Sequence, residues 1–290
     1  MGTRGSALAL RQAEAVADAL RAAWRGLDCE LVPISTAGDR DRERPIPAFG
    51  GKGAFTAEIE AALASGAVDL AVHSLKDLPT APAAGVVLGA VTRREDPRDA
   101  LVSRHGGGLD ALRPGARVGT SSLRREAQIR SARADLVIVP LRGNVETRLR
   151  RLDEGACDAV VLALAGLLRL GLERRATEVL GPDRMLPAPG QGALAVQRRS
   201  ADDAVAGLLE PLHDRAAHAA TAAERAFQAA LAAGCSAPVG ALAEVRDGAL
   251  EMRTFVGEPD GRVVHRGRGR GDPAAPEELG RRLAAEVPAA

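Results

Sequence analysis

Residues 116–165 read ARVGTSSLRREAQIRSARADLVIVPLRGNVETRLRRLDEGACDAVVLALA, and their pattern indicates the fold class. Short apolar runs alternate in it with longer, Arg-rich segments. We predict strands at 116–120, 135–140 and 158–165, and helices at 121–132 and 144–155. Strands that alternate with helices favour parallel sheets with right-handed crossovers, so the stretch predicts an α/β domain.

The same alternation is found in the N-terminal part of the chain. Ser6 can cap a helix in which Val16, Leu20 and Trp24 repeat every four residues. Further strands are predicted at 30–34, 69–72 and 86–91, and a further helix at 55–65. The segment 37–53 is rich in Gly, Pro and charge and has no period, which is typical of a lid or a disordered loop.

The C-terminal part has a different pattern. An Ala-rich helix is predicted at 215–233, and Gly234 suits the position after its end. Strands are predicted at 238–245, 250–256 and 262–268, and a last helix at 275–286. The string RGRGRGD at 266–272 is then expected at a strand end and turn. These elements predict a small α+β module.

The length of 290 residues suggests two or three domains. We predict a discontinuous α/β domain 1 at 1–93 and 193–212, an α/β domain 2 at 94–192, and a C-terminal α+β domain at 213–290. Ligands of open α/β sheets bind at the carboxyl ends of the strands and often between domains.

Composition limits the classes of function. The net charge of +1 gives no general reason to expect nucleic acid or an anionic membrane as partner. The three cysteines, Cys29, Cys157 and Cys235, are widely spaced and form no zinc-type cluster, so we expect no metal and a reduced, cytoplasmic chain. The longest apolar run, 159–168, is too short to cross a bilayer.

Cys235 lies in the turn-like sequence GCSAP at 234–238. A core cysteine is usually surrounded by apolar side chains, whereas a cysteine in a turn is more often reachable and nucleophilic. Its position between a predicted helix and a predicted strand marks it as a candidate attachment site.

The strongest local signal for a ligand is VGTSSLRR at 118–125. Thr120, Ser121 and Ser122 offer hydroxyl and backbone N–H groups at a helix start, and Arg124 and Arg125 follow at once. A helix start favours anions, and guanidinium groups add forked donors for a carboxylate or phosphate. Two cations oppose the helix dipole there, which favours a functional reason for them.

Two other strand-to-helix turns are also basic. Arg142 precedes Gly143 and Arg148 lies one turn into the next helix, while Arg4 stands beside Gly5 and Ser6. Three basic turns suggest a polyanionic small molecule rather than a single phosphate.

The segment DLAVHSLKDLP at 69–79 places Lys76 and Asp77 after a predicted strand. Lys52 and Lys76 are the only lysines among 39 basic residues, which suggests that these sites need an ammonium group. Asp77 could stabilise a developing positive charge or move a proton, although an exposed ion pair with Lys76 is the plainer reading. We expect His73 to be structural.

Together these motifs resemble the porphobilinogen deaminase (hydroxymethylbilane synthase) family. GTRGSALAL, GGKGAF, AVHSLKDLP, REDPRDALVS, VGTSSLRR, LRGNVETRL, LPAPGQGAL, TAAERAF and GCSAPVG occur in the family's order over nearly the whole chain. The resemblance implies two periplasmic-binding-protein-like (type II) α/β domains joined by two crossovers, with a third domain that carries the cysteine. It also implies a monomer.

The resemblance further implies a transferase of tetrapyrrole biosynthesis. Such an enzyme deaminates four porphobilinogen units, joins them head to tail on a dipyrromethane primer, and releases hydroxymethylbilane by hydrolysis. The primer would be bound to Cys235 through a thioether. Because every pyrrole carries an acetate and a propionate, the growing chain is a polycarboxylate, which agrees with the many basic turns.

Residue roles carry over by matching positions. Asp77 is the implied catalytic residue. The implied cofactor-binding residues are Cys235, Lys76, Thr120, Ser121, Ser122, Arg124, Arg125 and Asp39. The implied substrate-binding residues are Arg4, Ser6, Arg142, Arg148, Gln191, Lys52 and Phe55. Residues 39–55 would form the family's mobile active-site loop.

Two other classes of protein stay open at this point. A solute-binding or effector-sensing protein of the same two-domain architecture would need the anion cradle, but neither Asp77 nor a reachable Cys235. A nucleic-acid binder would need a basic chain with stacking aromatics, whereas this chain has a net charge of +1 and no Tyr.

Overall fold

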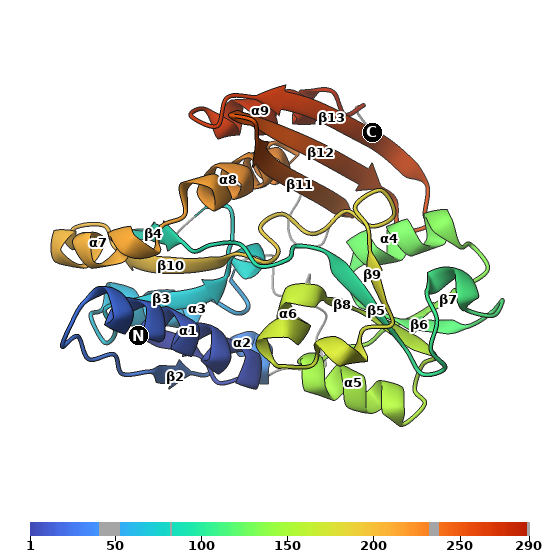
Figure 1. The fold of residues 1–290 in the computed structure, drawn as a ribbon, viewed down its shortest axis with the longest axis horizontal. Coiled ribbons are helices and arrows are strands. Elements are labelled where there is room, and N and C mark those ends of the chain that lie inside the picture. The colour runs from blue at the N-terminus through green and yellow to red at the C-terminus, as the bar shows by residue number, and fades with distance from the viewer. Residues whose placement is uncertain (41–52, 82, 232–237, 289–290) are drawn as a thin grey trace. The chain divides into compact units, whose positions relative to one another are not determined.

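The computed structural model describes residues 1–40, 53–81, 83–231 and 238–288 (Figure 1). By their internal contacts they form two compact units. The first is Met1–Glu95 with Ala193–His218, and the second is Asp96–Gly192 with Ala219–Ala290. The chain therefore leaves the first unit before Asp96 and returns to it at Ala193, as expected for two crossover segments.

The first unit is built on a five-stranded sheet with the order β2-β1-β3-β10-β4. Its strands are β1 (Gly2–Arg4), β2 (Val32–Ile34), β3 (Ala71–Ser74), β4 (Val86–Val91) and β10 (Leu194–Arg199). The first three are parallel, whereas β10 runs antiparallel to β3 and β4. The carboxyl ends of β1, β2 and β3 therefore share one edge of the sheet.

Helices cover both faces of this sheet. They are α1 (Ala7–Ala23), α2 (Ala37–Arg40), α3 (Ala57–Ala64), α7 (Asp203–Leu209) and the 3-10 helices η2 (Leu75–Asp77) and η5 (Glu210–Leu212). Val16 and Leu20 of α1 pack with Leu209 of α7 in one apolar cluster, and Ile59 and Leu63 of α3 form another. The apolar stripe read from the sequence is thus the buried face of α1.

The second unit contains a sheet of the same design, with the order β7-β6-β8-β5-β9. Its strands are β5 (Asp99–Ser103), β6 (Arg117–Gly119), β7 (Val137–Val139), β8 (Ala159–Ala163) and β9 (Glu178–Leu180). Again three strands are parallel, and β5 runs antiparallel to β8 and β9. The repeated strand order confirms the expectation of two periplasmic-binding-protein-like (type II) domains.

The helices of this second sheet are α4 (Leu123–Ala132), α5 (Val145–Asp153), α6 (Leu164–Arg169) and the 3-10 helices η3 (Leu109–Ala111) and η4 (Glu173–Arg175). The helices α4 and α5 follow predicted segments, whereas the other three were not predicted, and α6 begins inside the predicted strand 158–165. Ile129 of α4 packs into one apolar cluster, while Leu152 of α5 and Leu167 of α6 pack into another. The start of α4 follows the carboxyl end of β6 directly, which places VGTSSLRR at an edge where ligands bind in this class of sheet.

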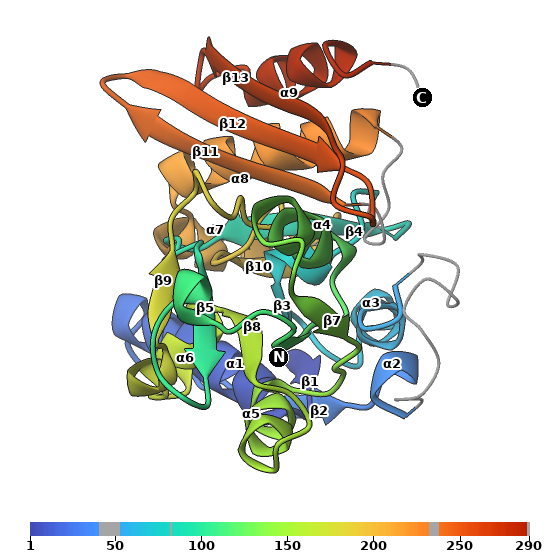
Figure 2. The ribbon, with the colours of Figure 1, turned by 90° about the vertical axis from the view of Figure 1, so that its right-hand side faces the viewer.

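The C-terminal module is a three-stranded antiparallel sheet with two helices on one face (Figure 2). Its elements are α8 (Arg215–Ala230), β11 (Val239–Arg246), β12 (Ala249–Gly257), β13 (Val263–Gly271) and α9 (Pro276–Ala285). Phe227 of α8, Met252 of β12 and Leu283 of α9 share one buried cluster. The small α+β module read from the sequence is confirmed.

The RGRGRGD string differs from its prediction, because β13 continues through it to Gly271. A Cβ atom on Gly269 would lie 3.1 Å from side-chain atoms of Leu279 and Leu283, closer than nearly all real Cβ contacts, so the glycine suits the close packing of α9 here. The alternating arginines, Arg266, Arg268 and Arg270, are exposed on the opposite face. The buried face of this part of β13 consists of glycines rather than large apolar residues. The alternation that predicts a strand was therefore missed, and the predicted strand ended too early.

The segment predicted to lack structure begins with the short helix α2. A Cβ atom on Gly38 would overlap the ring of Phe55, so this glycine is needed for the aromatic side chain to pack on the helix. The composition of this segment did not predict the short helix α2. The helix packs against Phe55, which lies 17 positions after Gly38, and a contact so far along the chain leaves no local pattern.

Candidate active site

The predicted residues of the first unit gather where the parallel strands end. Arg4 is the last residue of β1, and Lys76 and Asp77 form the turn of η2 directly after β3. Asp39 belongs to α2, which follows β2. Because β2, β1 and β3 are parallel neighbours, these side chains come from one edge of the sheet.

Arg4 is held by two partners of different kinds. Its Nε donates to Asp39 Oδ2 at 3.2 Å and its Nη2 also donates to the Asp39 carboxylate, while its Cζ lies 4.2 Å from the centroid of the Phe55 ring. Thr36 Oγ1 donates to Asp39 Oδ2 at 2.8 Å. Burial alone would raise the pKa of Asp39, but hydrogen bonds and charge from Arg4 outweigh it and lower the pKa, so the carboxylate is ionised at neutral pH.

The turn that carries Lys76 and Asp77 is anchored on both sides. Leu75 and Leu78 are buried, whereas Lys76 and Asp77 are partly exposed. A 3-10 turn with buried flanks fixes the backbone of Asp77, while the residue as a whole stays partly exposed. Ser6, the other predicted residue nearby, caps α1 by accepting a hydrogen bond from Ala9 N at 3.3 Å.

His73 is buried within β3, as expected for a structural residue. Burial lowers its pKa to about 4, and the charge of Arg4 acts in the same direction, against a weaker opposite effect of the nearby Gln197 side chain. Gln197 Nε2 in turn donates to Glu60 Oε1 at 2.8 Å. His73 is therefore neutral at neutral pH and belongs to the polar interior beneath the edge.

The start of α4 carries the predicted hydroxyl groups of the second unit. Thr120 Oγ1 accepts from Ser122 N at 3.1 Å, Ser121 Oγ accepts from Leu141 N at 3.1 Å, and Ser122 Oγ accepts from Arg125 N at 3.4 Å. Each hydroxyl group thus uses its oxygen to accept from the backbone and still has its own O–H to donate. Three such donors at a helix start suit a carboxylate.

Arg124 and Arg125 are buried, each only 5% exposed, and they share one carboxylate. Arg124 Nη1 donates to Asp99 Oδ2 and Arg125 Nη2 donates to Asp99 Oδ1, both at 2.8 Å. Burial would raise the pKa of Asp99, but the two guanidinium charges outweigh it and hold the pKa far below its usual range. One anion for two cations leaves this cluster with a net positive charge.

Gln191, Arg142 and Arg148 complete the predicted residues of the second unit. Gln191 is buried, and its Nε2 donates to Pro97 O at 2.7 Å and to Asp99 Oδ1 at 2.9 Å. Arg142 follows β7, and Arg148 Nε donates to Gly143 O at 2.9 Å. Gln191 therefore joins the Asp99 cluster, and Arg142 and Arg148 lie on the turn and helix that follow the neighbouring strand.

Two predicted residues, Lys52 and Cys235, lie outside the described residues. So do residues 41–52 of the expected active-site loop 39–55.

Sequence reasoning missed Asp99 and Glu224 as organising residues. Glu224 is fully buried and accepts from Gly190 N at 2.7 Å and from Ala243 N at 2.8 Å, so it fixes the segment before Gln191. Both acids lie in quoted motifs, REDPRDALVS and TAAERAF. Each acid stands next to an apolar run and has no basic residue three or four positions away. That pattern could have indicated a buried carboxylate with a distant partner.

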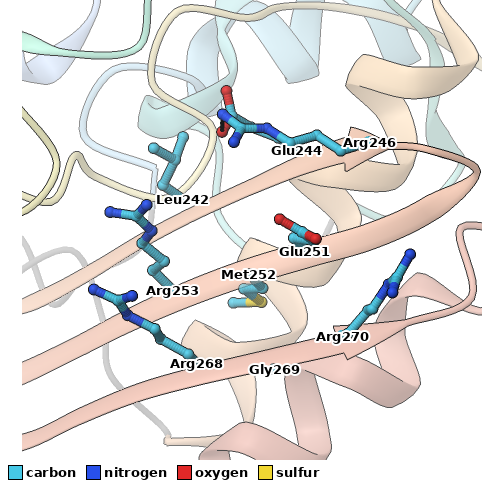
Figure 3. A pocket seen from close by; sticks show the side chains of 9 residues that line it. All are labelled: Leu242, Glu244, Arg246, Glu251, Met252, Arg253, Arg268, Gly269 and Arg270. Carbon is cyan, nitrogen blue, oxygen red and sulfur yellow. Dashed lines mark hydrogen bonds and ion pairs between the residues drawn. The ribbon is translucent and has the colours of Figure 1, made fainter.

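A hollow of about 360 Å³ lies on the C-terminal sheet, on the face turned away from α8 and α9 (Figure 3). Arg253, Arg268, Arg270 and Glu251 are among its lining residues, and none of the predicted site residues is. Arg253 and Arg268 both contact Asp183, at 2.8 and 3.3 Å.

Within the described residues, no helix is both long and apolar enough to cross a bilayer.

Comparison with known proteins agrees with these features. Residues 1–207 match the family described as "Porphobilinogen deaminase, dipyromethane cofactor binding domain", and residues 218–289 match "Porphobilinogen deaminase, C-terminal domain". The chain is 52% identical over 287 residues to the porphobilinogen deaminase of Roseiflexus sp. (strain RS-1), a match that covers 99% of this chain and 94% of the relative. It is 50% identical over 291 residues to that of Sorangium cellulosum (strain So ce56), covering 99% and 97%.

These matches span both parts of the molecule described above, the two α/β sheets and the C-terminal module. They confirm the resemblance read from the motifs. The chain belongs to the porphobilinogen deaminase family.

Proposed function

We propose that two groups of side chains, one at the edge of each α/β sheet, carry out the reaction of this chain. As a member of its family, the chain is a transferase of tetrapyrrole biosynthesis that works with a dipyrromethane cofactor. We assign it the condensation of four porphobilinogen units and the hydrolytic release of hydroxymethylbilane. When bound, the cofactor would supply the pyrrole carbon to which the first unit is added with loss of ammonia, and each later unit would add to the terminal pyrrole of the growing chain.

The single observation that supports the cofactor assignment is the buried Nε of Arg125, which lacks a hydrogen-bond acceptor among the described residues. A buried N–H without an acceptor costs about 1–3 kcal/mol, so the site is completed by an added acceptor. A carboxylate on the cofactor provides one and also neutralises the positive charge left by the Asp99 cluster.

The proposed roles follow from these two groups. We assign cofactor binding to Lys76, Thr120, Ser121, Ser122, Arg124, Arg125 and Asp39, with Cys235 as the point of attachment. We assign substrate binding to Arg4, Ser6, Arg142, Arg148, Gln191, Lys52 and Phe55. Asp77 is the proposed catalytic residue, because its partly exposed carboxylate can stabilise positive charge on a pyrrole nitrogen or move its proton.

The wider assignments belong to the same proposal. We place the protein in the cytoplasm as a monomer, with α/β domain 1 at 1–93 and 193–212, α/β domain 2 at 94–192 and the C-terminal domain at 213–290. The chain has three cysteines, and we reserve Cys235 for the cofactor.

The variant Arg124→His tests the cofactor assignment, with Arg130→His as the control on the same helix. Arg130 is bound only to Glu126 of its own helix in the contacts of the described residues, at 3.0 Å. Intact mass after incubation with porphobilinogen should show the mass of two pyrrole units on the wild type and on Arg130→His, but not on Arg124→His. A folded Arg124→His chain with the full added mass would contradict the assignment.

A further inference from the structure

The carboxylate of Asp99 is the common partner of three side chains assigned to ligand binding. Asp99 is the first residue of β5 and is paired in register with Ala163, the last residue of β8. It therefore lies at the edge of the sheet where β6 and β8 end. Its Oδ1 accepts from Arg125 at 2.8 Å and from Gln191 at 2.9 Å, and its Oδ2 accepts from Arg124 at 2.8 Å.

Backbone carbonyl groups complete the hold on both guanidinium groups. Arg124 Nη1 also donates to Leu186 O at 2.6 Å, and Arg125 Nη1 donates to Val161 O at 2.9 Å. Leu186 is itself fixed by Gln128, whose Oε1 accepts from Leu186 N at 2.8 Å and whose Nε2 donates to Leu186 O at 3.0 Å. Neither guanidinium group can turn without losing several buried hydrogen bonds.

This arrangement determines which N–H groups stay available to a ligand. Each Nη atom of Arg125 has one protein acceptor, whereas its buried Nε has none among the described residues. Arg124 uses Nη1 alone, so its Nε and Nη2 have no acceptor among the described residues. A guanidinium group binds a carboxylate best through two adjacent N–H groups, and Nε with Nη2 is such a pair.

We propose that Asp99 is a positioning residue for cofactor binding: it turns Arg124 so that Nε and Nη2 face the ligand carboxylate, and Arg125 so that Nε does. This inference rests on the proposed function. Asp99 touches no ligand itself and acts through the two arginines. An acid that served only stability would not need to leave some N–H groups of the two arginines without an acceptor. It would also not need the third contact with Gln191.

The alternative is an ion-pair cluster that only stabilises the domain. Removing one partner of a buried ion pair destabilises a protein strongly, so stability cannot separate the two accounts. Asp158 provides a matched control. It is 6% exposed, lies directly before β8 at the opposite end of that strand, and accepts from Arg117 N at 2.7 Å, with Arg113 also near.

The test compares Asp99→Asn, Asp99→Glu and Asp158→Asn with the wild type. Each purified chain is incubated with porphobilinogen below its own unfolding temperature, and intact mass gives the fraction that carries two pyrrole units. We expect loading of both Asp99 variants to fall at least about tenfold, the equivalent of one lost charge-assisted hydrogen bond. Asp158→Asn should lose stability yet load as the wild type does.

Asp99→Glu keeps the buried charge but displaces it, and therefore decides the matter if Asp99→Asn does not fold. A folded Asp99→Glu or Asp99→Asn chain in which the loaded fraction equals that of the wild type would overturn the inference. Loss of loading in Asp158→Asn to the same degree would also overturn it, because any destabilised chain would then behave alike. A wild type that never gains the mass would instead overturn the proposed function.

Discussion

The guanidinium group of Arg4 lies over the ring of Phe55, 4.2 Å from its centroid, while the same group is bound to Asp39. An arginine held in the plane by a carboxylate and on its face by an aromatic ring has little rotamer freedom left. The cost of ordering this side chain is met before any ligand arrives, which is how a binding site is preorganised.

Replacing Phe55 by Leu should weaken substrate binding without unfolding the protein. The lost cation–π contact is worth about 0.5–1 kcal/mol, so KM for porphobilinogen should rise roughly two- to fivefold. Steady-state kinetics measure the change, and Trp24→Leu, a large side chain outside the site, is the control. An unchanged KM in Phe55→Leu would show that the stacking does not contribute to binding.

Replacing Asp77 by Asn should lower turnover by at least about 100-fold, the range expected for loss of a group that stabilises charge or moves a proton. The unfolding temperature should change little, because Asp77 is partly exposed. Asp69→Asn is the control, since Asp69 is an exposed acid just before the same strand. Near-normal turnover in a folded Asp77→Asn chain would remove Asp77 from the mechanism.

His73 should make stability depend on pH. Its pKa in the folded protein is about 4 and its usual value is 6.5, so between these values the unfolded chain binds more protons. Its contribution is therefore complete above about pH 6.5 and is lost as the pH falls toward 4, by roughly 3 kcal/mol. Denaturant unfolding at several pH values should show a flatter curve for His73→Gln than for the wild type.

The exposed residue His105 provides the control for this experiment. It shows what replacing a histidine by Gln does to the pH curve at a position on the surface. A His73→Gln curve that ran parallel to that of the wild type would mean that His73 is not the group that titrates.

The alternation in β13 predicts opposite responses from neighbouring residues. Gly269→Ala should destabilise the chain by about 1–3 kcal/mol, because the added methyl group meets Leu279 and Leu283 of α9 at 3.1 Å. Arg268→Ala, on the exposed face, should change stability by no more than about 0.5 kcal/mol. Thermal unfolding measures both, and equal effects would contradict the assignment of the two faces.

The regular parts of the fold could be read from the sequence because their signals are local. The Arg-rich segment after Gly119 became α4, and the apolar run VVLGAV became β4 with the predicted bounds. The C-terminal helix and strands likewise lie within a few residues of their predicted positions. Where the period of apolar residues matches the element, one sequence is enough.

The site was only partly readable, because its organising contacts are remote in sequence. Arg124 and Arg125 opposed the helix dipole and so suggested a ligand, but their shared partner Asp99 precedes Arg124 by 25 residues. Burial of both arginines depends on that pairing, which no local pattern reveals. The same holds for Gly38: glycine is needed there because the ring of Phe55 packs against it, and no local pattern shows this.

Cys235 is proposed to carry a covalent primer, and intact mass spectrometry of the purified native protein would detect that primer. We predict an excess equal to two condensed pyrrole units on the wild type, acquired during expression or after incubation with porphobilinogen, and no excess on Cys235→Ser. An unmodified wild type after incubation with substrate, or the same excess on Cys235→Ser, would contradict the account.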